Sequence, residues 1–171
     1  MSARELILVA ARARATDWGA TTMGQLAQQA GVSRQSVYNE FGSKHGVAEA
    51  LVARELDAFL IEIDTQIAAG TSPSDSVDRA CRTVFAMAAE NPVVNAAITA
   101  AGGNPSPLLP LITSASLIDA VVQRADAALA AQYGAANRRE ALDAVVRLVI
   151  SHIVNPGGPP DMSFVTARLL A

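Results

Sequence analysis

The chain has 171 residues, 51% of them hydrophobic and 17% charged, with a net charge of −3 and one cysteine, Cys81. This composition excludes a disordered chain, an internal disulfide and a cysteine-rich metal site. No apolar run reaches the roughly 20 residues that cross a bilayer, and the first residues mix charges into a helical pattern unlike that of a signal peptide, so we expect a cytoplasmic protein that does not enter a membrane.

Breaker residues divide the first part of the chain into three predicted helices. The first spans about residues 3–17. Thr22 offers an N-cap for a short second helix, and Gly31 suits a left-handed C-cap at its end. Ser33 then caps a third short helix, which ends near Phe41.

The rest of the chain is also predicted to be helical, because sustained alternation of apolar and polar residues is missing. We therefore predict an all-α fold without internal repeats. The expected elements are a long helix over 43–69, a helix from Pro73 to Glu90, a short helix from Pro92 to Gly102-Gly103, a helix or kinked helix pair to Tyr133, a helix over 136–154, the linker NPGGPP and a final helix from about Asp161.

The two short helices before residue 42 have the spacing of a helix-turn-helix motif. Small residues at Ala30 and Gly31 permit a sharp turn, while Val37 and Phe41 would anchor the second helix of the motif. Its other face would then be polar, and such side chains suit a helix in the major groove of DNA, although a solvated surface helix is the alternative. These polar residues are Arg34, Gln35, Ser36, Tyr38 and Asn39.

The stretch TTMGQLAQQAGVSRQSVYNEFGSKHGVAEAL, from Thr21 to Leu51, resembles the DNA-binding signature of the TetR family of bacterial repressors. About 45 residues are similar in this way, and the rest only in length and helical layout. The resemblance implies an N-terminal three-helix helix-turn-helix DNA-binding domain over 1–46 and a helical-bundle domain over 47–171 that binds an effector and dimerises.

The resemblance also implies which residues contact DNA. Thr22 and Lys44 should bind phosphates. Arg34, Gln35 and Ser36 should face base edges or nearby phosphates, with Arg34 the best candidate for reading a guanine. Tyr38 should bond a phosphate and pack against a sugar or a thymine methyl. The implied DNA-binding residues are Thr22, Ser33, Arg34, Gln35, Ser36, Tyr38, Asn39 and Lys44.

Glu40 departs from the family pattern, which frequently has histidine or an aromatic residue there. A carboxylate facing phosphates would be repelled. Glu40 must therefore point away, pair with a nearby basic group, or accept a hydrogen bond from a cytosine amino group.

The predicted helix over 136–154 is apolar around nearly its whole circumference, so it needs partners on all sides. One face can pack in its own domain, and the other can pack against the same helix of a second subunit, unless it is the central helix of a monomer. The short final helix could join this interface. The candidate interface residues are Leu142, Val145, Val146, Val149, Ile150, Ile153, Phe164 and Val165.

The alanine-rich helices leave room between backbones and few charges point inward, so we expect a small apolar effector, such as a fatty-acid-like or hydrophobic drug-like molecule. The apolar candidates for the pocket wall could instead be ordinary residues of the hydrophobic core, and His152 could be a structural residue that contacts no ligand. The candidate pocket residues are Phe85, Met87, Asn95, Ile98, Leu117, Val121 and His152.

An enzyme is not expected. The two histidines lie in different segments without metal-ligand spacing, Cys81 lacks an evident base, and neither a glycine-rich phosphate loop nor a nucleophile elbow occurs. We predict a ligand-responsive repressor without cofactor or metal, which binds palindromic double-stranded operator DNA as a homodimer. The alternative is a helical dimeric interaction protein without sequence-specific DNA binding.

Overall fold

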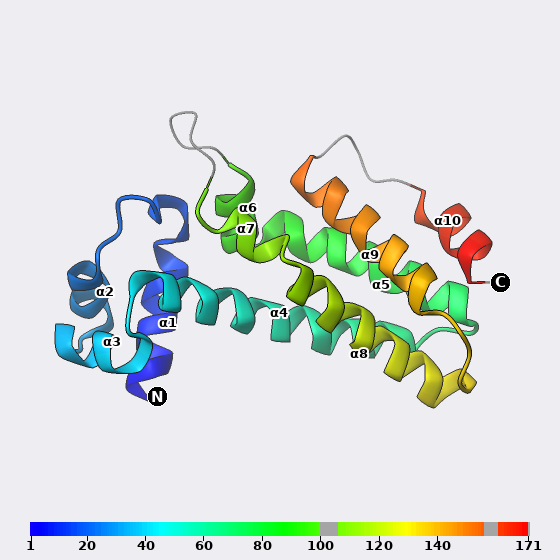
Figure 1. Cartoon of the computed structure of the whole chain (residues 1–171), viewed down its shortest axis with the longest axis horizontal. Coiled ribbons are helices and arrows are strands. Elements are labelled where there is room, and N and C mark those ends of the chain that lie inside the picture. Colours follow the sequence, from blue (N-terminus) through cyan, green and yellow to red (C-terminus); the bar gives the residue numbers. More distant parts are fainter. Residues whose placement is uncertain (100–105, 156–160, 171) are drawn as a thin grey trace. The chain divides into compact units, whose positions relative to one another are not determined.

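The computed structural model describes residues 1–99, 106–155 and 161–170. Throughout these ranges the regular elements are helices, which confirms the predicted all-α fold, and none of the described helices is long and apolar enough to cross a membrane. The elements are α1 (Ala3–Ala13), the 3-10 turn η1 (Ala15–Asp17), α2 (Met23–Ala30), α3 (Arg34–Phe41), α4 (Lys44–Ala68), α5 (Pro73–Glu90), α6 (Pro92–Ile98), α7 (Leu109–Ile112), α8 (Ala115–Tyr133), α9 (Arg139–Val154) and α10 (Met162–Leu169) (Figure 1).

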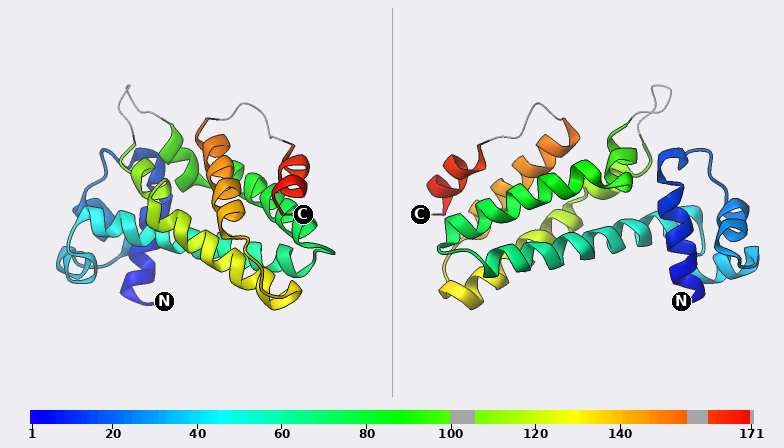
Figure 2. Two further views of the ribbon diagram at one scale, coloured as in Figure 1. Left: turned by 45° about the vertical axis from the view of Figure 1, so that its right-hand side comes forward. Right: turned by 180° about the vertical axis from the view of Figure 1, so that it is seen from behind.

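The helices form two compact units, and the division falls inside α4. The first unit comprises Met1–Glu55 and Asn91–Ile112, and the second comprises Leu56–Glu90 and the described residues from Thr113 onward. In the first unit α1, α2 and α3 pack on one another, and α6 packs on η1 and α1 (Figures 1 and 2). Its core holds fully buried side chains from α1, α2, α3, α4 and α6, among them Ile7, Leu26, Val37, Leu51 and Val93.

The predicted caps of the first unit are confirmed. The Thr22 hydroxyl accepts from the Gln25 amide at 3.3 Å, and the Gln25 side chain accepts from the Thr22 amide at 2.8 Å, which together form a capping box. Gly31 ends α2 with a φ of 67°, a left-handed conformation that costs glycine little. The Ser33 hydroxyl accepts from the Ser36 amide at 3.0 Å and starts α3.

In the second unit α9 packs against α8 and α5, and α10 packs against α5. The core is built from apolar faces at helical spacing, as α5 illustrates with Val77, Ala80, Cys81 and Ala88 buried. The other large members of this core are Ile63, Ile67, Ile118, Val122, Leu129, Leu142, Val145, Val149, Met162 and Leu170.

A buried polar cluster fixes the turn between α4 and α5. The Tyr133 hydroxyl lies 2.8 Å from both the Gly70 carbonyl oxygen and the Ser76 hydroxyl, and the Ser76 hydroxyl lies 2.9 Å from the Ile67 carbonyl oxygen, so the two hydroxyls form a polar network with these carbonyls. A Cβ atom on Gly70 would come within 2.0 Å of the Ser76 Oγ, so the close contact requires glycine here. The cluster ties the end of α8 to this turn.

Some boundaries differ from the prediction. The first helix ends at Ala13 and a 3-10 turn follows, since the Arg14 amide bonds to the Ala11 carbonyl at 3.1 Å instead of continuing the α-helical pattern. The short helix from Pro92 ends at Ile98, and the predicted stop at Gly102-Gly103 lies outside the described residues. Of the predicted linker NPGGPP, only Asn155 lies within them.

Candidate nucleic-acid interface

The exposed face of α3 carries two side-chain pairs, and the two residues of each pair lie one helical turn apart. The Gln35 side chain donates to the Asn39 Oδ1 at 2.8 Å. The Arg34 guanidinium lies 5.6 Å from the centre of the Tyr38 ring and donates to its hydroxyl at 3.4 Å. All four residues are exposed, whereas Val37 is fully buried, and Gln35 and Asn39 lie on the side of the helix opposite to it. The helix therefore presents an ordered row of donors and acceptors above an apolar anchor.

The N-terminal end of α3 adds two hydroxyls to this face. Ser33 is exposed and Ser36 is partly exposed, and their hydroxyls share a hydrogen bond of 2.8 Å. Thr22 is exposed at the start of α2, where its hydroxyl donates to the Gln25 Oε1 at 3.1 Å. These three predicted contact residues thus mark the N-terminal ends of the two helices of the motif, where backbone amides favour anions.

Lys44 is held against the loop that precedes α2. Its Nζ donates to the Gly19 carbonyl at 3.0 Å and lies 5.6 Å from the centre of the Trp18 ring. Partial burial lowers the pKa of Lys44, and the nearby Asp17 carboxylate opposes that shift. The lysine therefore links the first turn of α4 to the segment before α2.

Two residues outside the predicted set shape the C-terminal end of α3. Arg4 of α1 donates to the Glu40 carbonyl at 3.5 Å, and its guanidinium lies 4.7 Å from the centre of the Phe41 ring. Gly46 lies so close to Phe41 that a Cβ atom on it would come within 2.2 Å of the Phe41 carbonyl oxygen. Sequence spacing gives no sign of either contact, because each depends on how α1 and α4 approach α3.

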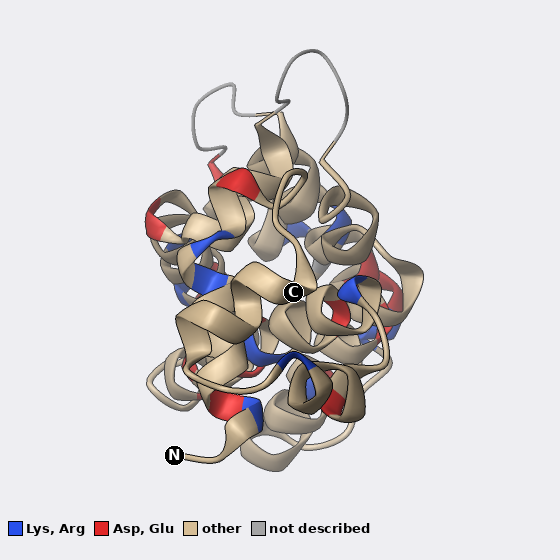
Figure 3. Cartoon of the chain, turned by 90° about the vertical axis from the view of Figure 1, so that its left-hand side faces the viewer, with Lys and Arg blue, Asp and Glu red and all other residues tan. Residues whose placement is uncertain are grey.

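Glu40 is exposed, and its backbone carbonyl, not its carboxylate, accepts from Arg4. At about 100° per residue, Glu40 lies about 60° around the helix from the buried Val37, whereas Gln35 and Asn39 lie about 160° from it. Glu40 therefore flanks the anchored side of α3. Figure 3 marks the charged residues, and in that view acidic and basic segments are interspersed along the ribbon.

The candidate effector residues fall into both units. Asn95 and Ile98 belong to the first unit, whereas Phe85, Met87, Leu117, Val121 and His152 belong to the second. Phe85 and His152 form an edge-to-face ring pair with centroids 6.4 Å apart, and the His152 Nδ1 lies 3.1 Å from the Leu148 carbonyl. Phe85 and Val121 pack against the core of the second unit.

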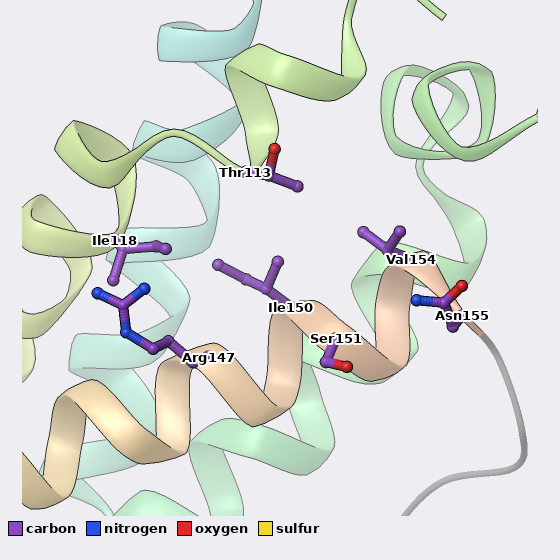
Figure 4. Close-up of a pocket in the computed structure, with 7 residues that line it drawn as sticks. All are labelled: Thr113, Ile118, Arg147, Ile150, Ser151, Val154 and Asn155. Atoms are coloured by element: carbon purple, nitrogen blue, oxygen red, sulfur yellow. The ribbon is translucent and has the colours of Figure 1, made fainter. Parts of the chain in front are cut away.

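A hollow of about 290 Å³ lies between the start of α8 and the C-terminal half of α9 (Figure 4). Ile118, Ile150 and Val154 form its apolar part, and Arg147 lies at one end, bonded through its Nε to the Asp143 carboxylate at 2.6 Å. None of the predicted effector residues lines this hollow.

The candidate interface residues of α9 lie mostly in the core of their own unit. Leu142, Val145 and Val149 are buried there, so they supply the core face of the helix and leave no surface for a second subunit. Val146, Ile150, Ile153 and Val165 are partly buried and pack against the same core. Phe164, with 73% of its surface exposed, and Leu148, with 39%, remain as large apolar groups open to a partner.

Among the described residues, no three histidine, cysteine, aspartate or glutamate side chains are placed to share a metal ion. Cys81 is buried, and burial raises the pKa of its thiol to about 12. The polar face of α3 therefore remains the main candidate site in the described part of the chain.

Two family models match the chain. Residues 7–51 match the model described as bacterial regulatory proteins of the tetR family, and residues 73–171 match the model of the bacterial tetracyclin repressor C-terminal domain. The chain is also 32% identical over 163 residues to the HTH-type transcriptional regulator AlkX of Mycobacterium tuberculosis, a match that covers 90% of this chain and 75% of that protein.

Solved structures resemble the whole fold. The TetR family repressor AlkX of Dietzia sp., implicated in biodegradation of n-alkanes, superposes with a TM-score of 0.73 at 25% identity, over 98% of this chain and 93% of that one. The fatty acid degradation regulator FadR of Bacillus halodurans superposes with a TM-score of 0.64 at 15% identity, over 96% of this chain and 94% of that one. The second likeness shows the shared fold alone.

Proposed function

Because this chain belongs to the TetR family of bacterial transcriptional regulators, and is therefore a DNA-binding regulator and not an enzyme, we propose that it represses transcription as a cytoplasmic homodimer bound to a palindromic operator. The observation that carries this proposal is the row of exposed polar side chains on α3 above the buried Val37. Two such helices, about 34 Å apart in the dimer, would enter successive major grooves.

On this proposal the predicted contact residues divide into two groups. Arg34, Gln35 and Asn39 reach base edges, since guanidinium and amide groups can form paired hydrogen bonds with guanine or adenine. Ser36 joins them or binds a nearby phosphate. The remaining residues bind the DNA backbone and set the register of the protein on the duplex. This second group comprises Thr22, Ser33, Tyr38 and Lys44.

We keep residues 1–46 as the proposed DNA-binding domain and residues 47–171 as the proposed effector and dimerisation domain. The proposed effector is small and apolar, in the class of a fatty acid or a related long-chain molecule. The name of one structural relative supports that class, because the AlkX repressor of Dietzia sp. is implicated in the biodegradation of n-alkanes. The described apolar surroundings of Phe85 and Val121 are compatible with it.

Effector binding would act by favouring a dimer in which the two α3 helices are differently spaced. The proposed lever is α4, because it begins beside the recognition helix and continues into the second unit. A coupling free energy of about 1–3 kcal/mol between the effector and DNA sites is usual for such regulators.

Operator binding can be tested by gel-shift titration against the DNA upstream of the protein's own gene, at several salt concentrations. Binding that is specific and persists at moderate salt supports the proposal. Weak binding that disappears by about 0.2 M salt and does not depend on DNA sequence would instead favour a dimeric interaction protein.

Arg34→Ala is expected to weaken the free energy of operator binding by about 1–3 kcal/mol and to relax the base preference at one operator position. An equal loss of affinity on all sequences would show that Arg34 contacts only phosphate.

The effector class has a separate test. Mass spectrometry of small molecules that remain bound through native purification should detect long-chain apolar compounds. Adding the detected compound to the protein–operator complex should then release the DNA. A polar metabolite in its place would overturn the proposed effector class and leave the proposed DNA binding intact.

A further inference from the structure

Arg4 is joined to the recognition helix by two contacts of different kinds. Its Nη1 donates to the Glu40 carbonyl at 3.5 Å, and its guanidinium lies 4.7 Å from the centre of the Phe41 ring. Arg4 belongs to the first turn of α1, whereas Glu40 and Phe41 are the last two residues of α3. The Arg4 side chain therefore connects α1 to α3, and the two bonded residues are 36 positions apart in the sequence.

The C-terminal end of α3 needs such support. The last carbonyls of a helix lack intrahelical partners and carry the negative end of the helix dipole, so a cation stabilises them. α3 has only eight residues and stops at Gly42, whose φ is 69° and whose amide donates to the Tyr38 carbonyl at 2.8 Å. A helix this short is marginal on its own and depends on packing for its position.

We propose that Arg4 is a positioning residue for operator binding, which holds the C-terminal end of α3 against α1 so that Arg34, Gln35 and Asn39 meet the bases together. The guanidinium acts through Phe41 and the Glu40 carbonyl and does not itself read the operator. The same contact places a cation beside Glu40, the one acidic residue of α3. This inference rests on the proposed sequence-specific DNA binding.

The first test compares Arg4→Met with Arg54→Met, which removes the same charge from an exposed position on α4. Arg4→Met is expected to weaken operator binding about five- to tenfold, as loss of one cation–π contact and one helix-end cation implies, with little change on unrelated DNA. The slope of log K against log salt should match that of Arg54→Met. A slope that falls by about 1 more than in the control would show a direct phosphate contact and overturn the proposal.

The second test does not use DNA. Hydrogen exchange of the Gly42 amide should be faster in Arg4→Met than in the unchanged protein, while amides in α5 keep their rates. Arg4→Lys should keep most of the operator affinity and most of the slow exchange of the Gly42 amide, since an ammonium group can also lie over Phe41. Unchanged exchange at Gly42, or an equal acceleration throughout the chain, would overturn the positioning role. If the unchanged protein has no specific operator, the proposed function fails, and the exchange result still reports on the Arg4 contact.

Discussion

At the residue scale, the position of Glu40 on α3 bears on whether its side chain reads a base. Like Arg34, it lies about 60° around α3 from the buried Val37, but it belongs to the last turn of the helix, whereas a recognition helix contacts base edges mainly through its N-terminal residues. We predict that Glu40→Ala leaves the order of preference among operator variants unchanged and strengthens binding to all of them by about twofold, because a repelled charge is removed. Competition gel shifts with single-base operator variants measure both quantities. A change of preference at one position would show that Glu40 reads a base.

Cys81 gives a second prediction at this scale. Burial raises the pKa of its thiol to about 12, with the Asp78 carboxylate adding to the shift, so the thiolate is almost absent at pH 8. We predict that a disulfide reagent modifies the native protein far more slowly than the protein unfolded in guanidinium chloride. Absorbance of the released thiolate measures the two rates. Comparable rates would mean that the helix around Cys81 opens readily.

Residue chemistry also shows what the sequence can and cannot predict. Thr22, Gly31 and Ser33 act on their immediate neighbours, so their caps follow from the order of residues alone. Arg4 and Gly46 act on Phe41 from different helices. Their roles depend on how helices approach each other, and local sequence patterns contain no information on that approach.

At the scale of the helices, Glu55 of α4 connects α1 and α6 to its own helix in the first unit. One carboxylate oxygen accepts from the Arg12 Nε of α1 at 3.0 Å, and the other accepts at 2.6 Å from Asn91, whose own oxygen caps α6. Only 12% of the Glu55 side chain is exposed. We predict that Glu55→Ala lowers the free energy of unfolding of this unit by about 1–3 kcal/mol, because two donors lose a charged acceptor.

Fluorescence of the buried Trp18, the one tryptophan of the chain, reports unfolding of this unit in urea. Glu49→Ala is the matched control, since Glu49 is exposed and pairs with His45 at 3.4 Å on the same helix. The control should shift the free energy by less than about 0.5 kcal/mol, as expected for an exposed ion pair. Equal effects of the two substitutions would mean that Glu55 does not link the helices.

Helical periodicity and breakers were sufficient to predict most elements, including the start of α5 at Pro73 and its end at Glu90. They did not predict that α6 packs with η1 and α1, so that Asn95 and Ile98 lie in a different unit from the other candidate pocket residues. Periodicity identifies the apolar face of a helix but not the helix that covers it. For the same reason, the apolar residues predicted around nearly the whole circumference of α9 did not show which of them its own core would bury, and the helix also exposes the Arg147–Asp143 ion pair.

At the scale of the whole molecule, the proposed dimer requires an apolar surface that the single chain leaves uncovered. The described second unit offers Phe164 on α10 and Leu148 on α9, at 73% and 39% exposure. A twofold interface uses each surface residue twice, so one introduced charge places two charges in the interface. Their desolvation would oppose association strongly.

We therefore predict that Phe164→Asp is mainly monomeric at micromolar concentration and loses cooperative binding to a palindromic operator. Sedimentation velocity measures the oligomeric state, and gel shifts on half-site and full-site DNA measure the cooperativity. Ile61→Asp is the matched control, because Ile61 of α4 is also apolar and 65% exposed and has no place in the proposed interface. If Phe164→Asp stays dimeric while Leu148→Asp dissociates, the interface is centred on α9 alone. If both remain dimeric, association uses a different surface, because neither charge is then buried by the partner.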